Sequence, residues 1–261
     1  MNKIISFYSY KGGAGRTTTM ANVAVLMANQ GYSVACIDLD LNAPGIDKAF
    51  EIKKPPQNSI IQWFRGVTIL PLKSMYVVYD KIDCKLNGKV LIFPAVRFPE
   101  IDNRQGIPDI SIKKIQSLAK RILDETKVDY IFLDAKSGYG PESTIHFVLP
   151  QLLFVTTRYS QQHMAGTQSI LTMLGKFAEL KKDYLKYVLI INDIPNDIPS
   201  NVRSSLNKTQ KKDNAILIAE NRRLRWKDSI IIGHESCDEQ LMNSYKTIVK
   251  TITGGEKSLN V

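Results

Sequence analysis

The sequence has little that would support a disulfide-bonded, metal-cluster or membrane-spanning protein. Its 261 residues include three cysteines, Cys36, Cys84 and Cys237, which lie far apart and share no metal-ligand spacing. No apolar stretch reaches the roughly 18 residues that a membrane span needs, and the first residues lead into a strand pattern instead of a signal peptide. We therefore expect a cytoplasmic protein without a membrane anchor.

The composition is that of a globular protein with an excess of basic charge. It is 44% apolar and 23% charged, which excludes disordered and collagen-like chains, and the formal net charge is +10. Residues 200–227 hold eight basic and two acidic side chains. Such a stretch attracts nucleic-acid phosphates, although a solvated surface explains it equally well. The candidate DNA-binding residues are Arg203, Lys208, Lys211, Lys212, Arg222, Arg223, Arg225 and Lys227.

Short apolar, β-branched runs alternate with segments of helical spacing. Unbroken apolar runs are typical of strands buried on both faces, and their alternation with helices indicates a parallel sheet. The predicted fold is α/β: a three-layer, mostly parallel twisted sheet flanked by helices, with ligands at the carboxyl ends of the strands. The expected strands are residues 3–9, 33–39, 89–93, 130–133, 152–157, 187–191 and 215–219, and the clearest expected helices are 18–29, 112–125 and 166–180.

A chain of this length fits one such domain, residues 1–261. Residues 53–110 depart from the alternating pattern, since they contain Pro55-Pro56 and Asn87-Gly88. There we expect an irregular insertion of loops with a small antiparallel excursion. Residues 253–261 contain two glycines and little apolar content, so we expect a flexible tail.

A glycine-rich loop stands between the first expected strand and the first expected helix. It reads Tyr10-Lys11-Gly12-Gly13-Ala14-Gly15-Arg16-Thr17-Thr18-Thr19. Glycines let backbone N–H groups turn toward phosphate oxygens, and the helix N-terminus adds its positive dipole end. The Thr17 hydroxyl is then placed to ligate Mg²⁺. This context predicts a phosphate-binding loop.

The loop departs from the usual Walker A pattern, G-x-x-x-x-G-K-[ST], because Tyr10 replaces the first glycine and Arg16 the lysine. It resembles the deviant Walker A motif, K-G-G-x-G-K-[ST]-[ST], of the ParA/MinD family of P-loop ATPases (SIMIBI class), above all a subgroup with K-G-G-x-G-R. The resemblance implies ATP and Mg²⁺ as cofactors and an ATP-bound homodimer in which Lys11 reaches the partner subunit's nucleotide. It also implies a nucleotide-binding set of Gly12, Gly13, Ala14, Gly15, Arg16, Thr17 and Thr18.

Two later blocks extend the resemblance. Residues 37–45, Ile-Asp-Leu-Asp-Leu-Asn-Ala-Pro-Gly, look like the block in which a strand ends in Asp-x-Asp. This likeness implies that Asp40 orients the attacking water and that Asp38 supports the Mg²⁺ shell. Residues 129–134 look like the Walker B strand, which implies that Asp134 binds Mg²⁺ through water.

The resemblance covers residues 3–47 and 128–192 well and the rest poorly. Gly138 completes the D-x-x-x-G spacing of a second switch, and Asn192 stands where the family has its base-reading asparagine. The implied function is a nucleotide switch whose ATP-bound dimer engages a regulatory or cargo protein, or DNA without sequence preference. Because arginine is a bulkier, planar donor than lysine, we expect Arg16 to permit tight ATP binding but slow hydrolysis, stimulated by a partner.

Other functions fit the same fold. A scaffold that binds ATP without hydrolysing it differs only in turnover. A kinase or amide ligase is also compatible, although such enzymes do not need a residue like Lys11 directed at a partner subunit. A redox ATPase resembling the nitrogenase iron protein is excluded, because no cysteine lies between Cys84 and Cys237 to hold its cluster. The pathway, whether partition, positioning, conjugation or defence, stays open.

Overall fold

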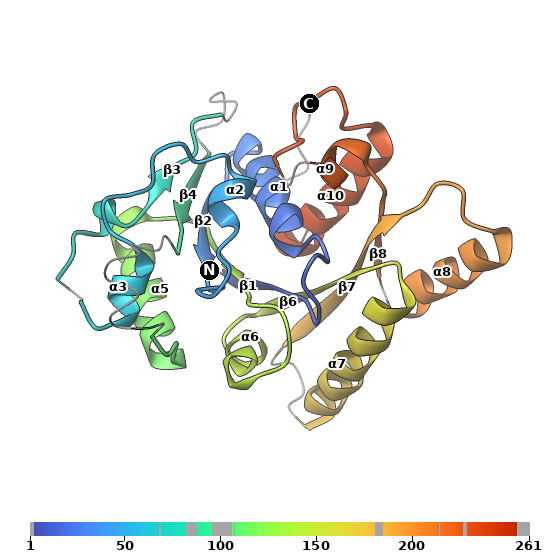
Figure 1. Ribbon diagram of the computed structural model, residues 1–261, viewed down its shortest axis with the longest axis horizontal. Helices are drawn as coiled ribbons and strands as arrows, with labels where there is room; N and C mark the ends of the chain where they lie inside the picture. The colour runs from blue at the N-terminus through green and yellow to red at the C-terminus, as the bar shows by residue number, and fades with distance from the viewer. Residues whose placement is uncertain are drawn as a thin grey trace.

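A sheet of eight strands, parallel except at one edge, runs through the centre of the structure (Figure 1). The computed structural model describes residues 3–67, 69–81, 88–95, 106, 108–180, 185–213, 215–226 and 229–254. Within them the strand order is β3-β4-β2-β5-β1-β6-β7-β8. The strands are β1 (Lys3–Tyr8), β2 (Ser33–Asp38), β3 (Val77–Val78), β4 (Lys89–Phe93), β5 (Tyr130–Asp134), β6 (Leu152–Arg158), β7 (Lys186–Ile194) and β8 (Ile216–Ala219).

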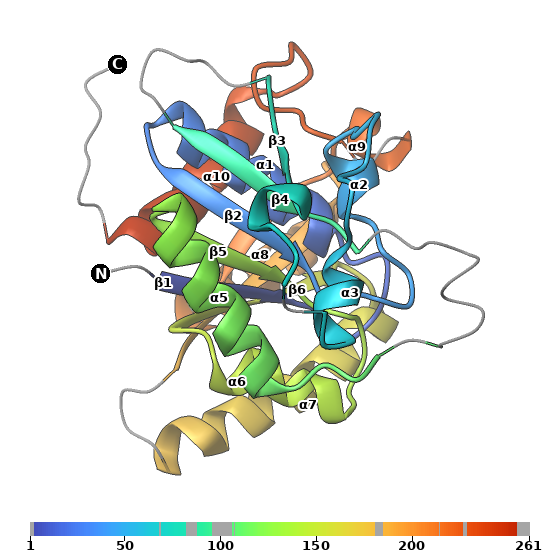
Figure 2. The same ribbon diagram turned by 90° about the vertical axis from the view of Figure 1, so that its left-hand side faces the viewer.

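Helices cover both faces of this sheet, which confirms the predicted three-layer α/β fold (Figures 1 and 2). The longer ones are α1 (Arg16–Asn29), α5 (Ile112–Thr126), α7 (Gln161–Leu180), α8 (Ser200–Asp213) and α10 (Glu239–Thr253). The short ones are α2 (Ile46–Ala49), α3 (Ile60–Phe64), α6 (Thr144–Val148), α9 (Arg222–Trp226) and the 3-10 turns η1 (Leu72–Ser74) and η3 (Pro141–Ser143). No helix in these described stretches has the length and apolar character that crossing a membrane requires.

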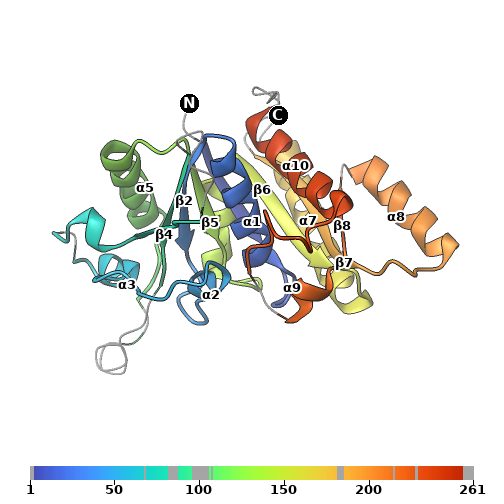
Figure 3. The same ribbon diagram turned by 90° about the horizontal axis from the view of Figure 1, so that it is seen from above.

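The two faces of the sheet are covered in different ways. On one face α1 lies beside α10, with α1 packed on β2 and β4 and α10 on β8, and all residues of α1 from Thr18 to Ala28 are buried (Figure 3). On the other face α5 is amphipathic and buries Ile115, Leu118 and Ile122, a spacing that places them on one side of a helix. At the far end of the molecule, α8 stands apart from the other helices (Figure 3).

The seven expected strands are all present, within three residues of their predicted ends. The antiparallel excursion expected in residues 53–110 is β3, which pairs with Leu91 and Ile92 of β4. The helix expected at 166–180 begins five residues earlier, at Gln161. Of the expected tail, Thr253 is the last residue of α10, Gly254 caps that helix with φ 70°, and the remainder lies outside the described residues.

The carboxyl ends of the central strands meet at one edge of the sheet. In the parallel register Asp134 of β5 is the neighbour of both Phe7 on β1 and Asp38 on β2. In the same way Arg158 of β6 lies beside Asn192 of β7. Polar groups that are far apart in the sequence are thereby gathered around the end of β1, where the glycine-rich loop begins.

Candidate functional site

The glycine-rich loop adopts a conformation that requires glycine at two positions. Gly13 and Gly15 have φ angles of 71° and 77°, in the left-handed region that side chains with a Cβ rarely adopt. The carbonyl of Gly15 accepts the first bond of α1, from the Thr19 N–H at 2.9 Å. A Cβ on Gly15 would also lie 2.7 Å from Nδ2 of Asn192. The N-terminus of α1 therefore follows the loop directly.

Behind the loop, Arg16 and Thr17 both bond to Asp134. The Arg16 Nε donates to Oδ1 of Asp134 at 2.6 Å, and the Thr17 hydroxyl donates to Oδ2 at 2.7 Å. The Arg16 Nη2 also lies 3.8 Å from Oδ2 of Asp40. Burial raises the pKa of the Asp134 carboxyl, and the guanidinium beside it opposes that rise. Arg16 is thus the cation that balances this buried carboxylate.

The two aspartates at the end of β2 have separate environments. Asp38 is fully buried, and its carboxylate accepts backbone N–H bonds from Asp40 at 3.0 Å and from Gly45 and Ile46 at 3.2 Å each. Burial and the nearby Asp134 raise the pKa of Asp38, while the N–H groups lower it. Asp40 instead lines the cavity described below. Asp38 therefore shapes the loop that carries Asp40.

On the opposite wall, the end of β7 approaches the loop. The Nδ2 amide of Asn192 donates to the carbonyl of Ala14 at 2.9 Å and lies 3.1 Å from the Thr19 hydroxyl. The next residue, Asp193, has a φ of 58°, and its carboxylate forms an ion pair with Arg158 at the end of β6. Asn192 thus binds the loop itself, a contact that the sequence did not reveal.

The first turns of α7 contact the outer side of the loop. The ring of Tyr10 lies against the backbone of Gly166, where an added Cβ would come within 2.0 Å of Tyr10 Cδ1. The Lys11 ammonium is 3.5 Å from Oε1 of Gln162. The ring nitrogen Nε2 of His163 lies 3.3 Å from the carbonyl of Gly12. Tyr10, which departs from the usual motif, is therefore part of the packing between the loop and α7.

The segment after β5 is also bonded to the first strand. The N–H of Gly138 donates to the carbonyl of Ser9 at 3.2 Å, and the carbonyl of Gly138 accepts a hydrogen bond from the Tyr8 hydroxyl at 2.9 Å. Deeper in the molecule, Nδ1 of the buried His146 lies 2.6 Å from the Ser6 hydroxyl. Burial lowers the pKa of His146 to about 3, so the imidazole is neutral at neutral pH.

These elements enclose a cavity of about 770 Å³, large enough for a nucleotide-sized ligand. Its lining residues are Ser9, Gly12, Gly13, Ala14, Gly15, Arg16, Thr17, Thr18, Thr19, Asp40, Ala43, Ser137, Arg158, Asn192, Asp193, Ile218, Ala219, Asn221, Leu224 and Tyr245. The cavity is thus lined by all the loop residues that are expected to bind a nucleotide, and also by Asn192. Lys11 is not among the described residues that line it.

The oxygen groups at the base of the cavity suit Mg²⁺. The described residues contain no group of three His, Cys, Asp or Glu side chains that would hold a metal alone. Mg²⁺ at nucleotide sites commonly has one or two carboxylates, with waters and phosphate oxygens as the other ligands. The Thr17 hydroxyl and Asp134, with Asp40 nearby, match this hard-oxygen set. Asp38 was expected to support the metal shell, and in the structure its carboxylate accepts hydrogen bonds from backbone N–H groups.

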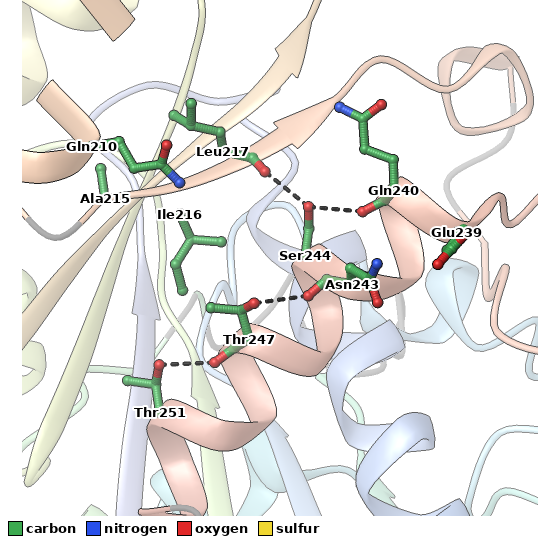
Figure 4. Close-up of a pocket in the computed structure, with 10 residues that line it drawn as sticks. All are labelled: Gln210, Ala215, Ile216, Leu217, Glu239, Gln240, Asn243, Ser244, Thr247 and Thr251. Carbon is green, nitrogen blue, oxygen red and sulfur yellow. Dashed lines mark hydrogen bonds between the residues drawn. The ribbon is translucent and has the colours of Figure 1, made fainter. Parts of the chain in front are cut away.

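A second pocket, of about 580 Å³, lies between β8 and α10 (Figure 4). Its hydroxyl groups bond to backbone carbonyls: Ser244 to Leu217 at 2.9 Å and Thr247 to Asn243 at 2.8 Å. Among the described residues that line it, Glu239 is the one charged side chain. This pocket shares no lining residue with the cavity at the glycine-rich loop.

The basic residues of 200–227 that the structure describes lie on two separate helices. Arg203 and Lys208 are exposed on α8, whereas Arg222 is exposed and Arg223 half-buried on α9. The figures show α8 and α9 well apart, and α9 lies beside the cavity (Figures 1 and 3). The side chains of Lys211, Lys212 and Arg225, and the whole of Lys227, lie outside the described part of the structure.

A buried strand, a glycine-rich loop and a helix N-terminus, with a hydroxyl and two carboxylates at the ends of parallel strands, define a P-loop nucleotide-binding protein. Residues 5–228 match the model of the CobQ/CobB/MinD/ParA nucleotide binding domain. The chain therefore belongs to this family. The sequence resemblance to ParA/MinD-type P-loop ATPases is thereby confirmed.

Individual relatives agree with this assignment. The septum site-determining protein MinD of Neisseria meningitidis is 27% identical over 176 residues, which cover 67% of this chain and 60% of that protein. MinD from Pyrococcus horikoshii, solved with Mg-ADP, superposes with a TM-score of 0.72 at 18% identity, covering 99% of this chain and 100% of that one. A plasmid partition protein from Borrelia burgdorferi gives 0.66 at 15% identity, with 97% and 99% covered. The cofactors expected from the sequence, ATP and Mg²⁺, are consistent with this family.

Proposed function

We propose that this protein is an ATP-dependent switch. It binds ATP with Mg²⁺, forms a homodimer around the nucleotides, and hydrolyses ATP slowly until a partner stimulates it. The observation that carries the dimer is the position of Lys11. Its side chain is half-buried, its ammonium lies 3.5 Å from Gln162 on α7, and it does not line the cavity of its own chain within the described residues. A lysine at the rim of the loop is available to a nucleotide bound by a second subunit.

The other residues take roles that follow from their contacts. The N–H groups from Gly12 to Gly15 and the start of α1 bind the phosphates, and Thr17 and Asp134 hold Mg²⁺, which supplies charge neutralisation at the phosphates. Asp40 lines the cavity and orients the attacking water. Asp38 acts through Asp40, because it fixes the backbone of the loop that carries it.

Slow hydrolysis is supported by the contacts of Arg16. Its guanidinium lies against the carboxylates of Asp134 and Asp40, the same oxygens that Mg²⁺ and the attacking water require. Phosphoryl transfer depends mainly on positioning and charge stabilisation. Arg16 must therefore leave its carboxylate partners and turn to the phosphates before the site is ready for hydrolysis.

The ATP-bound form engages a regulatory or cargo protein, or DNA. Exposed Arg203 and Lys208 on α8 favour contact with phosphates or an acidic protein surface. Dimerisation places two copies of α8 on one particle, so the nucleotide state controls the number of such contacts. This arrangement allows release after hydrolysis without any base-specific recognition.

Light scattering with a slowly hydrolysed ATP analogue tests the proposal. The 29.4 kDa chain is expected to double in mass with the analogue and to stay monomeric with ADP. Lys11→Ala is expected to bind the analogue but remain monomeric, whereas Lys48→Ala, which removes an exposed lysine outside the cavity, dimerises like the wild type. A Lys11→Ala protein that dimerises normally contradicts the proposed role.

Two alternatives are distinguished by turnover. A non-hydrolysing scaffold forms the same ATP-bound dimer but releases no phosphate, even with its partner. A kinase or amide ligase consumes ATP only with an acceptor molecule and does not need Lys11. Phosphate release by the purified protein, measured with and without Lys11→Ala, separates these functions from the switch.

A further inference from the structure

Arg158, Asn192 and Asp193 line the cavity at the ends of β6 and β7, next to the glycine-rich loop that Asn192 contacts, and the inference drawn from them rests on the proposed binding of a nucleotide. The phosphates belong at the N–H groups of the loop and the start of α1. From there the cavity extends along the ends of β6, β7 and β8 to Leu224 of α9. The base of a bound nucleotide must therefore lie toward this end.

The orientation of the Asn192 side chain is fixed by the loop. Both hydrogens of its Nδ2 amide have acceptors, the Ala14 carbonyl at 2.9 Å and the Thr19 hydroxyl at 3.1 Å. Its remaining polar group is Oδ1, which can only accept a hydrogen bond. An amino group of the base can donate a hydrogen bond to this oxygen. A carbonyl oxygen of the base at the same place would be repelled by it, because both atoms are acceptors.

Beside Asn192, a carboxylate and a guanidinium are bonded to each other. Arg158 is the cross-strand neighbour of Asn192, and its guanidinium forms an ion pair with the carboxylate of Asp193. The side chains are 41% and 20% exposed, so both are accessible from the cavity that they line. The left-handed φ of 58° at Asp193 turns this residue out of the regular strand, so that it shares a cavity with the residue before it.

Adenine and guanine differ in the groups that the carboxylate of Asp193 could bind. Guanine has two adjacent donors, N1–H and the 2-amino group, which a carboxylate accepts together, whereas adenine has an acceptor at N1 and no 2-amino group. We propose that Arg158 determines base specificity: by pairing with Asp193 it keeps that carboxylate from accepting guanine, next to the asparagine to which the family resemblance already gives the reading of the base. The selection of ATP over GTP thus depends on an ion pair outside the phosphate loop.

Competition binding tests this inference. A fluorescent ADP analogue is displaced by ATP or GTP, and the ratio of the two dissociation constants is measured for each variant. Arg158→Ala is expected to shift the ratio toward GTP by about tenfold, the size of one good bidentate base contact. Adding Asp193→Asn to Arg158→Ala is expected to cancel the shift. Arg158→Lys, which keeps the charge, is expected to preserve most of the preference for ATP.

Arg121→Ala serves as the matched control, because it removes an arginine from an ion pair with Glu125 on α5 that does not line the cavity. An unchanged ratio in Arg158→Ala, a shift that survives Asp193→Asn, or a selective loss of GTP binding would overturn the inference. The assay needs neither dimerisation nor hydrolysis. A protein that selects bases as expected but stays monomeric with ATP contradicts the proposed switch alone, and a dimerising protein with an unchanged ratio contradicts this inference alone.

Discussion

The guanidinium of Arg16 is bonded to the carboxylate of Asp134, with Nε 2.6 Å from Oδ1. Because the Thr17 hydroxyl takes Oδ2, both oxygens of Asp134 have partners inside the chain. An arginine at this loop position is therefore tied to the residue proposed to hold Mg²⁺. In the proposed switch the divalent cation would compete with this side chain for one carboxylate, and the competition would set how readily the site becomes active.

Replacing Arg16 with lysine tests this competition. The planar guanidinium of Arg16 bonds to Asp134 and also reaches Asp40, whereas a lysine has one compact ammonium and cannot contact both carboxylates. Arg16→Lys is expected to lower the Mg²⁺ concentration for half-maximal phosphate release and to raise turnover severalfold. Phosphate release is measured across a Mg²⁺ titration, with Arg121→Lys as the same exchange on α5, outside the cavity. Unchanged Mg²⁺ dependence would show that Arg16 does not compete with the metal.

Asp40 and Asp38 are expected to respond differently to substitution. Asp40→Ala removes the group proposed to orient the attacking water, so turnover should fall about 10²- to 10⁴-fold while ATP affinity changes little. Asp38→Ala leaves three backbone N–H groups, two of them buried, without their acceptor, so the free energy of unfolding should fall by about 1–3 kcal/mol. Denaturant unfolding and single-turnover hydrolysis check the two effects. Loss of ATP binding in Asp40→Ala would reassign the water-orienting role.

The separation of α8 from α9 refines the expected DNA binding. The double substitution Arg203→Glu with Lys208→Glu on α8 is expected to weaken duplex binding by the ATP-bound dimer and to reduce the salt dependence, while ATP affinity is unchanged. Reversal of Arg222 and Arg223 on α9 is expected to alter ATP affinity as well, because Leu224 of that helix lines the cavity.

Fluorescence anisotropy with a labelled duplex across a salt series measures both effects. Each phosphate contact contributes about 0.9 to the slope of log affinity against log salt, so the α8 variant should lose roughly two to four units over the two subunits of the dimer. An ATP-bound dimer that fails to bind any duplex at low salt would exclude DNA, and the α8 surface would then be assigned to an acidic protein.

His146 is expected to make the folded state sensitive to acid. Its pKa is about 3 in the folded protein, whereas the unfolded chain takes up the proton near pH 6.5. Between these values only the unfolded state is protonated at this site, so stability falls as the pH falls. The contribution is about 2 kcal/mol between pH 7 and pH 5. Urea unfolding of the wild type and of His146→Asn at pH 7 and pH 5 isolates this contribution. An equal loss of unfolding free energy in the two proteins would contradict the assignment to His146.

The sequence predicted those parts of the molecule that local patterns encode. The strands were recognisable because a strand buried on both faces is a continuous apolar run. The loop was recognisable because glycines, arginine and threonines stand between a strand and a helix. By contrast α10 was missed, although Leu241, Tyr245, Ile248 and Ile252 have helical spacing. Its buried face packs on β8 and on α1, which is distant in the sequence.

Features that depend on distant residues could not be predicted in the same way. Asp38 and Asp40 are two positions apart, so a continued strand would have placed them on one face. β2 ends at Asp38, and only Asp40 reaches the cavity. The pair of Arg158 with Asp193 joins residues 35 positions apart and is created by the parallel register of β6 and β7.

The packing of Tyr10 on Gly166 gives the loop a mechanical connection to the rest of the molecule. No Cβ fits between the tyrosine ring and the backbone of α7, so the two cannot approach further, and a shift of the loop toward α7 pushes the helix. The 20 residues of α7 form a rod of about 30 Å. A tilt of about 10° at the end held by the loop moves the far end, at Leu180, by about 5 Å. In the proposed switch, a rotation of α7 at its contact with Tyr10 would therefore displace the far end of the helix further than the loop itself moves.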